Sequence, residues 1–105
     1  MPDSDQLTAA VGKLVGQVSH WTPPRWAASG ASGVPRAATV HDLVQWLADR
    51  CAEAEGRAPL PVPRLDNDLA LPDQLKVVAA DLARFGGPAL MDEAAEKVRA
   101  VRGQL

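Results

Sequence analysis

Apolar side chains recur every three or four residues in four separate segments of this 105-residue chain. That spacing places them along one face of an α-helix, whereas a half-buried strand alternates apolar and polar residues. No segment of the sequence alternates in this way over the length of a strand. The pattern therefore predicts an all-α fold, a small irregular four-helix bundle that forms one domain over residues 1–105.

The first predicted helix runs from about residue 4 to residue 19. The residues of its apolar stripe are Leu7, Val11, Leu14, Val15 and Val18. The opposite face carries Thr8, Gly12 and Gly16, and each glycine inside a helix costs about 1 kcal/mol relative to alanine. Small residues let another backbone come close. We therefore expect this face to be either a plain solvent face or a seam against another helix, such as that of a second copy in a homodimer.

A double proline ends the first helix, with a tryptophan on each side. Trp21 precedes Pro23 and Pro24, and Trp26 follows them. Neither proline can continue the helix, because proline lacks the N–H group and clashes with the preceding turn. The residues that follow are small and rich in glycine, so we expect a flexible loop over about 27–38.

The second predicted helix begins at Thr39, which forms a variant of the capping box with Asp42, and ends at Gly56. Its expected buried stripe comprises Val40, Leu43, Val44, Leu47 and Cys51. Trp46 lies beside that stripe, so we expect a half-buried ring. Arg50, one turn further on, is expected to stack on that ring.

Three alternate prolines, at 59, 61 and 63, hold the next segment extended. We expect residues 57–70 to form a proline-rich extended strap across the bundle. The side chains expected to contact the bundle are Leu60, Val62 and Leu65.

Two further helices follow the strap. The third begins at Pro72, a residue type favoured in the first turn of a helix, and its stripe comprises Leu71, Leu75, Val78, Ala79, Leu82 and Phe85. The fourth, over about 88–102, buries Met91, Ala94, Val98 and Val101. Because the connection at 86–88 is short, we expect these two helices to form an antiparallel hairpin.

Composition and charge exclude several classes of partner. Alanine, glycine, proline and arginine have GC-rich codons, and their abundance indicates a GC-rich bacterial genome. The formal net charge is −2, which lacks the basic footprint of a nucleic-acid binder. No apolar run approaches the roughly 20 residues that span a membrane, and the acidic start has no apolar core like that of a signal peptide. The single Cys51 cannot form an internal disulfide, so we expect a cytoplasmic protein.

The residues that carry chemistry do not form a recognisable constellation. His20 and His41 lie 21 positions apart, a separation that zinc sites do not use. Counted from Asp66, Leu71 occupies the sixth position of a calcium loop, where glycine is required. Cys51 lies on a buried stripe, and no glycine-rich phosphate loop follows a strand. We therefore expect no metal, no cofactor and no catalytic residues; an enzyme that uses either histidine with Arg25 is the least favoured hypothesis.

The remaining candidates are sites of contact. Trp21, Arg25 and Trp26, together with Trp46 and Arg50, are of the residue types enriched at interaction hot spots. For the two rings that flank the double proline, the favoured hypothesis is that they cover the end of the core. The preferred hypothesis is a small non-catalytic protein that acts by protein–protein interaction or self-association. The alternative is a binder of a small apolar or aromatic ligand between helices near Trp21 and Trp26.

Overall fold

The computed structural model describes residues 4–64 and 67–105, and within them the chain is helical without strands. In chain order the elements are α1 (Ser4–Val18), α2 (Pro23–Ala27), α3 (Arg36–Glu55), the short 3-10 helix η1 (Asp68–Ala70), α4 (Leu71–Phe85) and α5 (Pro88–Gln104). The all-α prediction is confirmed, with four long helices and one short helix that the sequence patterns did not predict. None of these helices is long and apolar enough to cross a bilayer.

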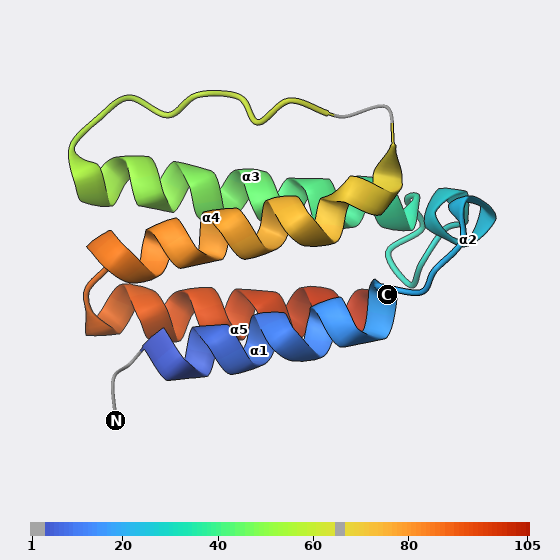
Figure 1. Ribbon diagram of the computed structural model, residues 1–105, viewed down its shortest axis with the longest axis horizontal. Helices are drawn as coiled ribbons and strands as arrows, with labels where there is room; N and C mark the ends of the chain where they lie inside the picture. Colours follow the sequence, from blue (N-terminus) through green and yellow to red (C-terminus); the bar gives the residue numbers. More distant parts are fainter. Residues whose placement is uncertain (1–3, 65–66) are drawn as a thin grey trace.

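The four long helices lie at the corners of a square (Figure 1). Helices α4 and α1 form the near face of that view, with α3 behind α4 and α5 behind α1. Helices α3 and α4 run in the same direction, and α1 and α5 run in the opposite one. Each helix therefore has one parallel and one antiparallel neighbour.

The prediction that the last two helices pack against each other as a hairpin is wrong. Helices α4 and α5 are antiparallel, but each packs on α1 and α3, so the two lie at diagonal corners. The turn between them is tight at Gly86, where an added Cβ would clash with the Met91 Cε atom and lie 3.0 Å from the Leu82 carbonyl oxygen. Glycine thus lets the chain cross the bundle diagonal in two residues.

The strap makes the parallel packing of α3 and α4 possible. The 20 residues of α3 span about 30 Å, so the chain must return that distance before α4 can begin beside the start of α3. A proline-rich chain rises about 3.1 Å per residue, so roughly ten residues are enough. Figure 1 shows residues 57–64 running back along α3 as an extended segment.

Side chains of α3 hold the strap through its backbone. The Val62 N–H donates to Gln45 Oε1 at 2.6 Å, and Gln45 Nε2 donates to the Leu60 carbonyl at 3.1 Å. His41 Nε2 lies 3.1 Å from the Val62 carbonyl. Val62 packs on the core as predicted, but Leu60 is 68% exposed. Because an extended proline-rich chain has three residues per turn, two positions spaced by two cannot face the same side.

The predicted apolar stripes form the core with few exceptions. All the stripe residues expected on α1, α3 and α5 are buried, and α3 ends at Gly56, whose φ is 74°. On α4 the stripe fails at Phe85, which is 46% exposed because the helix ends there. Leu65 lies outside the described residues.

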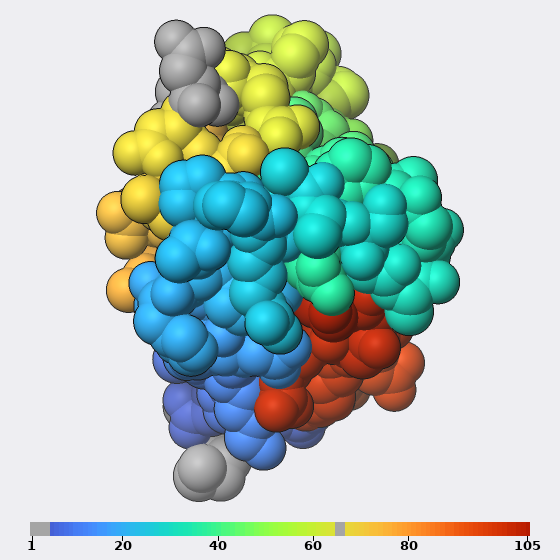
Figure 2. All heavy atoms as spheres, turned by 90° about the vertical axis from the view of Figure 1, so that its right-hand side faces the viewer, coloured from blue at the N-terminus to red at the C-terminus, as the bar shows by residue number. Residues whose placement is uncertain are grey.

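The start of α3 corrects two predictions. Thr39 is not the cap: the helix begins at Arg36, and Thr39 is buried inside it. The predicted loop over 27–38 was too long, because α2 occupies its start and α3 its end. Residues 28–35 form a closed turn, with a bridge between Ser29 and Pro35 and a left-handed Gly33. The Ala31 N–H donates to the Gln104 carbonyl at 2.9 Å, which ties this turn to the end of α5 (Figure 2).

Candidate interaction surfaces

The two tryptophans around the double proline are packed inside the molecule. Pro23 and Pro24 occupy the first turn of α2, after an extended Thr22. That turn brings Trp26 against Trp21, with ring centroids 5.0 Å apart and planes at 69°. This edge-to-face arrangement is the one that aromatic pairs prefer. Trp26 is fully buried and Trp21 is 5% exposed.

Two arginines cover the Trp21 ring. The Arg25 and Arg36 guanidinium carbons lie 5.0 Å and 5.7 Å from its centroid. The structure therefore brings together the expected group of Trp21, Arg25 and Trp26, but only the arginine is exposed. A shallow hollow of about 480 Å³ beside this group is lined by Gln17, His20, Trp21, Thr22 and Arg25. The surface there is formed by polar side chains around one ring edge.

Trp46 forms a second, separate group further along α3. Its ring is half-buried, and Arg50 lies over it with the guanidinium carbon 5.4 Å from the centroid, as predicted. Lys97 of α5 approaches the same ring to 5.8 Å, a contact that the sequence did not indicate. A cleft of about 390 Å³ beside the ring is lined by Asp42, Trp46, Lys97 and residues of the turn at 28–35. One carboxylate, one ammonium group and one aromatic ring thus share a cleft that can hold a small polar molecule.

The small-residue face of α1 forms one wall of a groove. Thr8, Gly12 and Gly16 are exposed, and together with Lys76, Ala79 and Ala80 of α4 they line a groove of about 470 Å³ whose surface is mostly apolar. A Cβ added at either glycine would meet no atom within 4 Å. The packing of the described residues therefore does not require glycine at these positions.

The apolar surface continues over the outer side of α4. Val77 is 61% exposed, and it lines a second hollow of about 360 Å³ together with Val62, Val78, Ala70, Asp73 and Gln74. The two hollows thus flank the outer side of α4, a helix on the near face of Figure 1. Val77 does not belong to the apolar stripe of α4. Its exposure could therefore have been predicted from the sequence.

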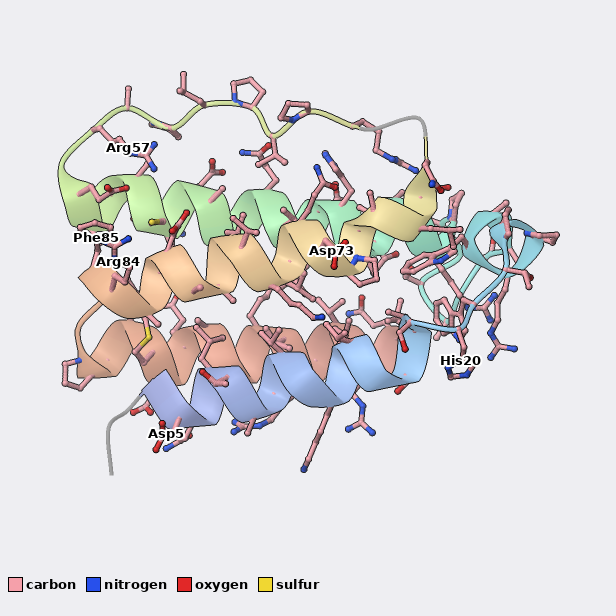
Figure 3. All side chains as sticks on the ribbon, in the orientation of Figure 1. Asp5, His20, Arg57, Asp73, Arg84 and Phe85 are labelled. Atoms are coloured by element: carbon pink, nitrogen blue, oxygen red, sulfur yellow. The ribbon has the colours of Figure 1, made fainter. Side chains whose placement is uncertain are left out.

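The titratable residues do not gather. Among the described residues no three His, Cys, Asp or Glu side chains form a group that could hold a metal ion. His41 binds the strap, and His20 is exposed at the end of the bundle (Figure 3). Asp68 pairs with Arg64 at 3.0 Å, and Asn67 caps η1 by accepting from the Leu69 N–H. Asp66 lies outside the described residues.

Cys51 is a core residue with an unreactive thiol. Burial raises the pKa of this thiol, and the hydrogen bond from Sγ to Glu55 Oε2, at 3.5 Å, raises the pKa further, as does the negative charge of that carboxylate. A nucleophilic cysteine needs the opposite shift, because the thiolate is the reactive form.

The raised pKa of Cys51 predicts a loss of stability in alkaline solution. The pKa is higher in the folded chain than its ordinary value of 9.0. The unfolded chain therefore loses the thiol proton first, and the stabilisation is complete below pH 9 and is lost as pH rises through the folded-state pKa. We expect the free energy of unfolding to fall more steeply above about pH 9 in the wild type than in Cys51→Ala. Urea denaturation across this range measures both slopes, and equal slopes would contradict the prediction.

Comparison of the chain with models of known protein families, with curated proteins and with solved structures finds no match.

Proposed function

We propose that this chain is a non-catalytic interaction module that binds a protein surface through the face formed by α1 and α4. The observation that carries the proposal is the 470 Å³ groove between these helices, in which three exposed small residues of α1 face Ala79 and Ala80. Exposed apolar patches are typical of surfaces that contact proteins, membranes or ligands.

The broad side of the molecule is large enough for such a contact. A specific protein–protein interface buries about 800 Å² on each partner. The molecule measures 37 × 29 × 21 Å. Helices α1 and α4, which line the groove, lie on the broad side that faces the viewer in Figure 1. Val77 and Ala80, near the middle of α4, are exposed.

Charge and chemistry support a protein as the partner. The net charge of −2 offers no attraction to nucleic acid. The raised pKa of the Cys51 thiol and the separation of His20 from His41 support a role without catalysis. A chain with one cysteine suits a reducing compartment, so we propose that the protein acts in the cytoplasm.

Photo-crosslinking tests the proposal in the native cell extract. A photoreactive benzoylphenylalanine in place of Ala80, on the proposed face, is expected to form protein adducts on irradiation. The same residue in place of Ala100, which is exposed on α5, is the matched control and is expected to form none. Absence of adducts at position 80, or equal adducts at both positions, would contradict the proposal.

A further inference from the structure

We propose that the occupant of this face is a second copy of the chain, docked through α4 in an antiparallel orientation about a two-fold axis that passes between Val77 and Ala80. The inference rests on the proposed function, because it names the partner of the same face. Most soluble oligomers have closed symmetry, and a two-fold dimer uses the same patch on both copies.

The outer strip of α4 is complementary to itself when reversed. Asp73, Val77, Ala80 and Arg84 are exposed and spaced by four, three and four residues, so they follow one face of the helix. The two-fold rotation sets Asp73 of one copy against Arg84 of the other, twice, and Val77 against Ala80, twice. The strip thus has a charged pair at each end and apolar contacts in the middle.

The two charges at the ends of this strip are available for such pairing. Figure 3 shows Asp73 and Arg84 near opposite ends of α4. Among the described residues, neither Asp73 nor Arg84 takes part in an ion pair. The ion pairs there are formed by Arg50, Arg57 and Arg64, each with an acidic residue close to it in the sequence. Arg84 rests near the Phe85 ring, with 5.5 Å between its guanidinium carbon and the centroid.

A parallel arrangement of the two copies is disfavoured by the same charges. It would set Asp73 against Asp73 and Arg84 against Arg84. Like charges that face each other across an interface act against that pairing. The sign pattern along α4 therefore selects the antiparallel orientation.

The neighbouring surfaces fit the same rotation. Gly12 lines the groove beside Ala79 and Ala80, and a Cβ added at Gly12 would meet no atom within 4 Å, so this side of α4 leaves space for the second copy. The rotation also brings the exposed Phe85 of one copy to the level of Pro72 and Asp73 of the other. That is where the apolar hollow beside the strap lies.

Charge reversal at the two ends of the strip tests the arrangement by sedimentation equilibrium. The wild type is expected to be a dimer, and Asp73→Arg and Arg84→Asp are each expected to raise the dimer dissociation constant at least about 10-fold. An equimolar mixture of the two variants is expected to form a heterodimer of near wild-type affinity, because both of its pairs are then of opposite charge. Asp92→Arg on α5 makes the same change in net charge as Asp73→Arg and is expected to have no effect.

The outcomes separate this inference from the proposed function. A monomeric wild type, single variants that dimerise like the wild type, or a mixture that stays monomeric overturns the inference. If either variant fails to fold, as judged by circular dichroism, the salt dependence of wild-type dimerisation is the test. The dimer dissociation constant of the wild type is expected to rise between about 50 mM and 500 mM salt, because salt screens the pairs of Asp73 with Arg84. A dissociation constant that does not change with salt would contradict the inference. Adducts at position 80 that contain only a different protein support the proposed function and overturn the second copy as occupant.

Discussion

Replacing Trp26 by alanine is expected to lower the free energy of unfolding by about 3–5 kcal/mol. Trp26 is fully buried, has the largest side chain among the fully buried residues, and stacks edge-on against Trp21 at 5.0 Å. It belongs to α2, which packs against α3 and η1. A domain of this size is stable by only about 5–15 kcal/mol, so the variant loses a large share of its stability.

Urea denaturation followed by circular dichroism measures this loss. Trp46→Ala is the matched control, because its ring is half-buried at a cleft, and we expect a loss of about 1–2 kcal/mol there. Trp26→Phe is expected to cost less than Trp26→Ala, since the phenyl ring refills most of the space that alanine leaves empty. Both variants remove the indole N–H, which has no hydrogen-bond partner among the described residues. Equal losses for Trp26→Ala and Trp46→Ala would contradict this account of the Trp26 site.

Replacing Gln45 by alanine is expected to lower the free energy of unfolding by about 1–3 kcal/mol, because it removes two of the hydrogen bonds that hold the strap. Gln45 accepts from the Val62 N–H and donates to the Leu60 carbonyl, so its amide pairs with the strap as a neighbouring strand would. Without this side chain the partly buried Val62 N–H loses its partner. Leaving such a group unsatisfied costs more than the net value of an ordinary hydrogen bond.

Gln74→Ala is the matched control for the strap. Gln74 also binds the strap, but through one exposed hydrogen bond to the Pro63 carbonyl, so its loss is expected to cost less than about 0.5 kcal/mol. Hydrogen exchange supplies the local measurement: the Val62 amide is expected to exchange faster in Gln45→Ala and at the wild-type rate in Gln74→Ala. Unchanged exchange at Val62 in Gln45→Ala would contradict the proposed role.

The candidate surfaces followed from the sequence only in part. The residue types singled out the tryptophans, but tryptophan is suited both to a core and to an interface. Trp26 belongs to the core because α2 places its ring against Trp21. The small residues at 8, 12 and 16 were visible as a pattern. Their significance depends on Ala79 and Ala80 of α4, which are more than sixty residues away in the chain.

By itself the sequence determined that the chain is helical and which side of each long helix is buried. Both properties are local, because a period of 3.6 residues carries an apolar stripe such as that of Leu43 and Leu47 onto one face wherever the helix is placed. The tertiary structure alone decided that α3 packs parallel to α4, that Gln45 holds the strap, and that Phe85 stays exposed. Each of these depends on which distant segment arrives beside the residue, and the spacing of side chains within one helix carries no information about its neighbours.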